Sequence, residues 1–273
     1  MVEIEKIIDI EKVIRNSDSR LLSSLPKFLI RRIEKLVRQD EMNASIHRSR
    51  HLTGVPFVNE ILKGWNVNVI VKGEENVPPE GKFVFVANHP VGGIDALSFL
   101  SLIYRFFPNV ISPSNQLFNY IPNLHPVILG VNVFGSNTKE TASKLNRLFE
   151  SDSQVMIFPA GEVSRRQKGK ITDVTWQKTF ITKSVQYQRD VIPVFISGRN
   201  SGFFYFIANL RKRLGIKMYI ETILLPGEMM KQRNSSIALS IGKPISWQTF
   251  TPDKSQIHWA QAVKDIVYKM GES

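Results

Sequence analysis

The sequence predicts an α/β fold, with a mostly parallel central sheet flanked by helices. From about residue 66, short β-rich runs alternate with helix-like stretches, which is the order of elements in parallel α/β domains. The runs "QVMIFP" (154–159) and "VIPVFIS" (191–197) are apolar at successive positions, as expected of strands that helices cover on both sides. The earlier part of the chain is helix-like. We therefore expect an N-terminal helical segment over residues 1–65 and a single α/β domain over residues 66–273.

The expected elements of the α/β domain follow one another along the chain. Strands are expected at "VNVIVKG" (67–73) and "KFVFVANH" (82–89), which a Pro-Pro-Glu-Gly turn separates. The other strands are expected at 109–112, 127–134, 154–159, 191–197 and 236–242. Helices are expected at 94–106, 139–151, 176–188 and 254–270, the last of which closes the domain.

Bulk composition limits the classes of partner and chemistry. The chain has no cysteine, which excludes disulfides, thiolate metal sites and a cysteine nucleophile. Its formal charge is +12, and this surplus favours a polyanionic partner such as nucleic acid, an anionic membrane surface or an acidic carrier. The first residues, "MVEIEKIIDIEKVIR", alternate charged with apolar side chains, so we expect no secretion signal. Every apolar run is shorter than the roughly 18 residues needed to cross a bilayer, so we expect no membrane span.

Two basic, apolar segments leave their role open. Residues 27–38 are expected to form an amphipathic helix with the apolar residues Leu29, Ile33, Leu36 and Val37 on one face and the cations Lys27, Arg31, Arg32, Lys35 and Arg38 on the rest. The segment "SGFFYFIANLRKRLG" (201–215) sets aromatic side chains beside a basic cluster. Either segment can lie on an anionic membrane or pack on the protein behind it.

The stretch "VANHPVGGIDALS" (86–98) is a strand-to-helix junction, where ligands collect in parallel α/β sheets. His89 is expected at the strand exit, and Asp95 in the first turn of the next helix, with Gly92 and Gly93 between them. A carboxylate that orients an imidazole makes it a general base. By spacing alone, a helix-capping aspartate and a histidine in a turn are the favoured interpretation, because both roles are common for these residue types.

Four ordered blocks decide between these interpretations by resemblance. "NHPVGGIDAL", "LGVNVFGSN", "IFPAGEVSRR" and "VIPVFISGRNS" resemble the blocks of the lysophospholipid and glycerol-phosphate acyltransferase superfamily, over roughly residues 66 to 245. The resemblance implies the acyltransferase fold, over residues 66–273, and transfer of a fatty acyl group to a hydroxyl. The donor is an acyl-carrier protein or coenzyme A thioester, and neither a metal nor a bound cofactor is required.

The resemblance also assigns roles to residues. His89 would deprotonate the acceptor hydroxyl and Asp95 would orient His89, while backbone N–H groups at Gly93 or Gly161 would bind the oxyanion. The residues expected to contact substrate come from the second and third blocks: Gly130, Phe158, Pro159, Gly161, Glu162, Ser164, Arg165 and Arg166.

This chain departs from the family pattern at three places. Five residues separate His89 from Asp95, where the family has four, and we expect the glycines to absorb the extra residue so that the pair still meets. Ala160 stands where the family has glutamate, and Glu162 either replaces that glutamate or is structural. The second block lacks the family's phosphate-binding arginine, which argues against glycerol 3-phosphate as acceptor.

The version of the motifs seen here resembles the hemolysin-like bacterial branch, which includes O-acyltransferases that make ornithine or glycine lipids. A lyso-amino-acid lipid acceptor with a carboxylate would suit the basic run "SRRQKGK" (164–170), although a solvated basic loop explains that run equally well. The alternatives are acylation of lysophosphatidic acid or another lysophospholipid, and a non-catalytic basic protein that binds membrane or nucleic acid. We see no nucleic-acid-binding pattern and expect a peripheral protein on the cytoplasmic side of the inner membrane.

Overall fold

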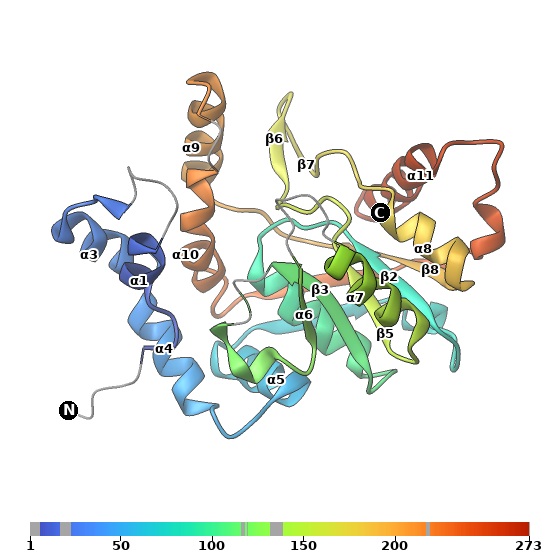
Figure 1. The fold of residues 1–273 in the computed structure, drawn as a ribbon, viewed down its shortest axis with the longest axis horizontal. Helices are drawn as coiled ribbons and strands as arrows, with labels where there is room; N and C mark the ends of the chain where they lie inside the picture. Colours follow the sequence, from blue (N-terminus) through green and yellow to red (C-terminus); the bar gives the residue numbers. More distant parts are fainter. Residues whose placement is uncertain are drawn as a thin grey trace.

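A computed structural model describes residues 6–16, 23–115, 118, 120–131, 139–216 and 219–272 (Figure 1). Within this part of the chain, seven strands form one sheet in the order β1-β9-β8-β2-β5-β3-β4. The strands are β1 (Asn68–Lys72), β2 (Phe83–Ala87), β3 (Val110–Asn115), β4 (Ile128–Val131), β5 (Gln154–Ile157), β8 (Asp190–Ile196) and β9 (Ser236–Ile241). A separate antiparallel hairpin consists of β6 (Arg165–Gln167) and β7 (Lys170–Thr172).

The sheet is mostly parallel, as the sequence predicts. Strands β8, β2, β5, β3 and β4 all pair in parallel, so their carboxyl ends share one edge of the sheet. The one reversal lies between β8 and β9, which pair antiparallel before β9 continues in parallel with β1. Strand β2 is at the centre of the parallel part, and every residue of β2 is buried.

Helices cover both faces of the sheet. They are α1 (Ile10–Arg15), α3 (Lys27–Leu36), α4 (Gln39–Arg48), α5 (Gly54–Gly64), α6 (Gly93–Tyr104), α7 (Lys139–Glu150), α8 (Thr179–Tyr187), α9 (Gly202–Arg213), α10 (Leu225–Met230) and α11 (Gln256–Met270). Alternate side chains of β2 separate the two cores. Phe83 and Phe85 pack with α5 and α6, whereas Val84 and Val86 pack with α7, α8 and α11.

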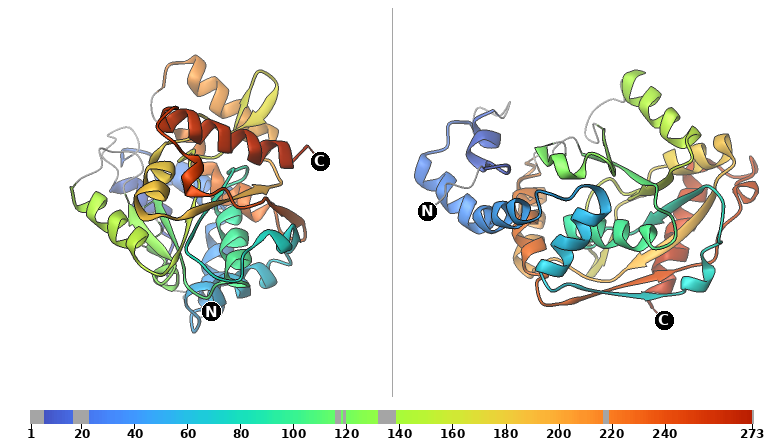
Figure 2. Two further views of the ribbon diagram at one scale, coloured as in Figure 1. Left: turned by 90° about the vertical axis from the view of Figure 1, so that its right-hand side faces the viewer. Right: turned by 90° about the horizontal axis from the view of Figure 1, so that it is seen from below.

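The N-terminal helices α1, α3 and α4 lie together at one end of the molecule, while α11 lies towards the other (Figures 1 and 2). The expected helix over 27–38 ends at Leu36, because Arg38 adopts the left-handed conformation with φ 57° and a second helix, α4, begins at Gln39. The apolar stripe of α3 is largely packed within the protein, since Ile30 and Val37 are buried and only Phe28 and Leu36 stay exposed. The division of the chain at residue 65 stays a prediction.

The other sequence-predicted elements are all present, with ends that differ by a few residues. Part of the expected strand 127–134 lies outside the described residues. The basic run 164–170 is not a plain loop, because it forms most of the β6–β7 hairpin with Lys168 at its turn. Within the described ranges, every helix is too short or too polar to cross a bilayer.

Candidate active site

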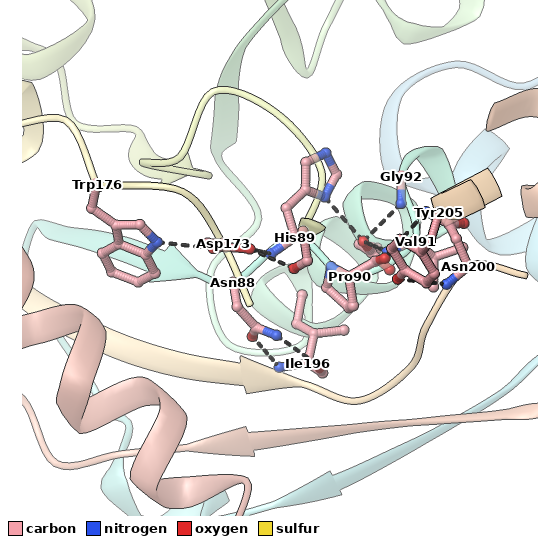
Figure 3. A network of polar contacts seen from close by, with 12 residues as sticks. Asn88, His89, Pro90, Val91, Gly92, Asp173, Trp176, Ile196, Asn200 and Tyr205 are labelled. Atoms are coloured by element: carbon pink, nitrogen blue, oxygen red, sulfur yellow. Dashed lines mark hydrogen bonds and ion pairs between the residues drawn. The ribbon is translucent and has the colours of Figure 1, made fainter. Parts of the chain in front are cut away.

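The site begins where β2 ends. Asn88, the first residue after the strand, joins β2 to β8: its amide Nδ2 donates to the Ile196 carbonyl at 2.9 Å, and its Oδ1 accepts from the Ile196 N–H at 2.7 Å. Figure 3 shows this pair below His89, whose ring points away from the sheet. Because the side chain of Asn88 is buried and doubly bonded, it fixes the backbone from which His89 departs.

His89 and Asp95 meet across the loop between β2 and α6. The Nδ1 atom of His89 lies 3.0 Å from Oδ2 of Asp95, and the side chains are 17% and 0% exposed, respectively. The same carboxylate oxygen accepts main-chain N–H groups from Val91 at 2.8 Å and Gly92 at 2.9 Å. The expectation that this pair meets despite the longer spacing is confirmed, and the catalytic roles of the two residues stay predictions.

The extra loop residue depends on glycine. Gly92 has φ 130° and ψ −130°, a backbone conformation that residues with a Cβ rarely adopt. Gly93, the first residue of α6, is also constrained, because a Cβ there would lie 2.6 Å from the Met229 sulfur of α10. The two glycines therefore allow both the sharp turn and the close approach of α10.

Phe158 orients the His89 ring. It follows β5 and stacks on the imidazole, with ring centroids 4.0 Å apart and an angle of 15° between the planes. With Nδ1 donating to Asp95, the opposite ring nitrogen, Nε2, carries the lone pair, and the partial exposure of His89 leaves it reachable. This arrangement can remove a proton from a bound hydroxyl.

A second buried carboxylate, Asp173, holds the main chain of His89. Its Oδ1 accepts the N–H of His89 at 3.3 Å and the hydroxyl of Ser164 at 2.5 Å, and its Oδ2 accepts the indole N–H of Trp176 at 2.8 Å. The Ser164 N–H in turn donates to the His89 carbonyl at 2.7 Å. Burial, together with the negative charge of Asp173, raises the pKa of Tyr268 to about 12, so this hydroxyl stays protonated where it accepts the Asp173 N–H.

The sequence analysis missed Asp173. The available signal was "TDVTW" (172–176), where an aspartate and a tryptophan stand three residues apart just before a helix. That spacing alone does not indicate that the carboxylate reaches back to His89.

Two predicted roles in the third block need correction. Ser164 was expected to contact substrate, but it is buried, its hydroxyl donates to Asp173 and its main-chain N–H donates to the His89 carbonyl. Gly161 was expected to contact substrate and, through its N–H, to bind the oxyanion. That N–H already donates to the Phe158 carbonyl at 3.0 Å, which contradicts the oxyanion role, while the contact of Gly161 with substrate stays a prediction. The alternative donor, Gly93, has no acceptor among the described residues.

Neighbouring arginines in the hairpin have different surroundings. The guanidinium of Arg165 lies 2.6 Å from the Glu162 carboxylate and 3.0 Å from that of Glu221, which also pairs with Arg211 at 2.9 Å. Glu162 is thus an ion-pair partner of Arg165, and its predicted contact with substrate stays a prediction. Within the described residues no carboxylate pairs with Arg166, an exposed residue whose guanidinium lies over the Tyr205 ring at 5.5 Å.

The remaining predicted residues lie further from the dyad or face inwards. Gly130 is in the edge strand β4, which β5 and β3 separate from β2 by about 14 Å of sheet. Pro159 is buried, and its carbonyl accepts the N–H of Gln177. The sheet therefore keeps Gly130 away from His89, whereas Pro159 directly follows Phe158, which stacks on the His89 ring.

The histidine–aspartate pair lies at the carboxyl edge of the parallel strands of an α/β sheet. Comparison with known proteins shows the class of enzyme to which a chain with this fold and site belongs. The chain matches the family described as "Acyltransferase" over residues 12–271, and it belongs to that family; the protein is an acyltransferase. The lyso-glycine lipid O-acyltransferase of Bacteroides thetaiotaomicron is 41% identical over 265 residues, which cover 97% of each chain. The lyso-glycine lipid O-acyltransferase of Phocaeicola vulgatus is 40% identical, over 97% of this chain and 95% of its own.

Among solved structures, the 1-acyl-sn-glycerophosphate (LPA) acyltransferase PlsC of Thermotoga maritima is similar with a TM-score of 0.47 at 18% identity. The similarity covers 90% of this chain and 93% of PlsC.

Proposed function

We propose that this protein transfers a fatty acyl group from a thioester to the hydroxyl of a lyso-amino-acid lipid, and that a lyso-glycine lipid is the preferred acceptor. The observation that carries the proposal is the His89–Asp95 pair, whose imidazole is oriented and still reachable. The two relatives named as lyso-glycine lipid O-acyltransferases support the choice of acceptor, because they align over nearly the whole chain.

The proposed reaction needs only groups of the chain and its two substrates. His89 Nε2 takes the proton of the acceptor hydroxyl, and the resulting alkoxide attacks the thioester carbonyl carbon. The Gly93 N–H, at the start of α6, is the proposed donor to the tetrahedral oxyanion. The carbon–sulfur bond then breaks, and the thiolate leaves with the proton that the imidazolium returns. Asp95 stabilises that imidazolium throughout, and the products are an ester and a free thiol.

Arg166 is the proposed partner of the acceptor carboxylate. Arg165 is already neutralised by Glu162 and Glu221, so Arg166 is the one of the two adjacent arginines that keeps its guanidinium for a ligand. Its position over Tyr205 keeps it near the dyad, because Asn200 donates to the Tyr205 hydroxyl and also to the Pro90 carbonyl. A planar guanidinium matches the two oxygens of a carboxylate.

The donor and the location complete the proposal. We infer that the thioester is carried by acyl-carrier protein or coenzyme A, and that the protein acts at the cytoplasmic side of the inner membrane as a peripheral protein. The net charge of +12 supports both, since each carrier and an anionic leaflet are negatively charged.

Acyl transfer by the purified protein tests the proposal. Acyl-carrier protein and coenzyme A donors are each offered with lyso-glycine, lyso-ornithine and lysophosphatidic acid acceptors. We expect transfer to lyso-glycine lipid that is lost in the folded His89→Ala and Asp95→Asn variants. Transfer to lysophosphatidic acid alone would replace the proposed acceptor by a lysophospholipid. Activity that survives both substitutions would contradict the proposed general base.

A further inference from the structure

Helix α9 carries large apolar side chains on the face that points away from the protein. Phe203, Phe206, Leu210 and, just after the helix, Leu214 recur at the spacing of one helical face, and they are between 39% and 63% exposed. We call these four residues the outer row. The opposite face of α9 is also apolar, but there Phe204, Tyr205 and Ala208 are buried.

A surface helix normally has a polar face towards water, and a helix that is apolar on both faces is normally covered on both. The outer row has no cover among the described residues. By contrast, the apolar stripe of α3 is mostly packed within the protein. The outer row is therefore the larger uncovered apolar surface of the two segments that the sequence leaves open.

Exposed cations without an ion-pair partner among the described residues flank the outer row. Residues 202–216 contain no aspartate or glutamate, and the exposed Lys212 and Arg213 close the helix. Figures 1 and 2 show the β6–β7 hairpin rising beside α9 on the same side of the sheet, and the two elements are in contact. The hairpin adds the exposed cations Arg166, Lys168 and Lys170. An apolar row among cations matches a membrane with anionic headgroups above its acyl chains.

The position of α9 relates this surface to the chemistry. Ser201 caps the start of the helix, and the preceding residue, Asn200, donates to the Pro90 carbonyl in the loop that holds the dyad. Figure 3 shows Asn200 and Tyr205 on the same side as Val91 and Gly92. A membrane bound to the outer row would thus lie close to the loop that carries His89.

We propose that the outer row of α9, with the β6–β7 hairpin beside it, docks the protein onto an anionic lipid membrane. Apart from Arg166, which is the proposed partner of the acceptor carboxylate, the surface is separate from the groups that carry out the proposed reaction. It explains how a chain without a spanning helix in its described part reaches a lipid acceptor. Docking inserts Phe206 and Leu210 among acyl chains and places the hairpin lysines at the headgroups.

Sedimentation with vesicles tests the surface without any acyl donor or acceptor, so its outcome is independent of the proposed reaction. The full chain is mixed with vesicles of phosphatidylcholine alone or with added phosphatidylglycerol. We expect the wild type to bind the anionic vesicles, and Phe206→Ser with Leu210→Ser to weaken this binding about tenfold or more. Lys168→Glu with Lys170→Glu should remove the preference for phosphatidylglycerol.

The matched control removes two exposed apolar side chains from α11, by Ile257→Ser with Ile266→Ser, and should leave binding unchanged. The rival surface is tested by Phe28→Ser with Leu36→Ser on α3. Thermal melts confirm that each variant is folded. The proposal is overturned if the wild type does not bind anionic vesicles. It is equally overturned if the folded α9 variant binds as the wild type does, or if the α11 control loses as much binding as the α9 variant.

Discussion

The surroundings of His89 and the outer row of α9 are linked through Asn200, but their side chains differ in whether they have partners inside the protein. Around His89 the partners come from the protein itself, because Asn88, Asp95 and Asp173 each form hydrogen bonds with main-chain groups. On α9, the outer row and the exposed cations Lys212 and Arg213 have no partner within the described part of the chain. The side chains around His89 thus have their partners within the protein, whereas the outer row has none among the described residues.

The difference indicates that the network that positions His89 and the surface proposed for docking are independent of each other. A buried network holds reacting groups in place whether or not a ligand is present, whereas an exposed apolar row contributes nothing until it is covered. The effects of substitutions should therefore differ between the two regions. Those around His89 should change catalysis or stability but not membrane binding, and those on α9 should do the reverse.

The sharpest test of this separation is His89→Gln. Loss of a general base reduces turnover by about 10³-fold, and the partly exposed side chain contributes little to the core. Initial rates of acyl transfer measure the first effect and vesicle sedimentation the second. Binding that falls together with turnover would show that the two regions are not independent.

The next largest effect is expected at the border between the regions. Arg165→Met leaves the buried Glu221 with Arg211 as its described partner and should destabilise the fold by about 3 kcal/mol. The adjacent Arg166→Met is the matched control, and because Arg166 is exposed its stability cost should stay within about 0.5 kcal/mol. Urea unfolding measures both. Arg166→Met should instead raise the KM for carboxylate-bearing acceptors, and equal costs for the two variants would contradict the structure.

Asp173→Asn removes a charged acceptor below His89. We expect a stability loss of about 2 kcal/mol, because the donors from Ser164 and Trp176 lose a carboxylate. If Asp173 positions His89, kcat should fall about tenfold with little change in KM. Trp176→Phe is the control, since it removes one donor to Asp173 without touching His89. A similar fall of kcat in both variants would make the effect merely structural.

The smallest effect is a pH dependence at the start of α9. Burial raises the pKa of Glu228, but hydrogen bonds from Lys231 and Ser201 outweigh burial and leave the pKa below its ordinary value. A lowered folded pKa stabilises the protein above the unfolded pKa, and this contribution disappears as the pH falls through the folded value. Glu228→Gln should therefore cost about 1 kcal/mol at neutral pH and less at about pH 3, below the ordinary pKa of glutamate.

Melting curves at the two pH values, with the exposed Glu80→Gln as control, measure the dependence. A cost that is the same at both pH values would contradict the assigned hydrogen bonds.

Much of the fold was predictable because apolar periodicity is a local property. The strands around "KFVFVANH" and "VIPVFIS" were predicted because both faces of a central parallel strand are apolar. The break at Arg38 was not predictable, because the apolar spacing continues through it and only the packing of α4 makes the left-handed residue favourable. The β6–β7 hairpin was missed for a similar reason, since its exposed cations resemble a solvated loop.

The site divides in the same way. His89 and Asp95 were predictable because they flank one turn, so their distance is set by a few backbone angles. The different surroundings of Arg165 and Arg166 were not, because Glu221 lies 56 residues after Arg165 (221 − 165) and reaches it only in the folded chain. The same holds for Asp173, which lies 84 residues from His89.

Asp95 also has a structural role that does not involve His89. Its carboxylate receives the N–H groups of Val91 and Gly92, and so closes the loop and starts α6. A chain that lost the histidine would still fold this loop and keep the negative charge in place. Half of the dyad is thus held in place by hydrogen bonds that belong to the loop itself, and exchange of the single side chain of His89 would remove the proposed base while leaving these bonds intact.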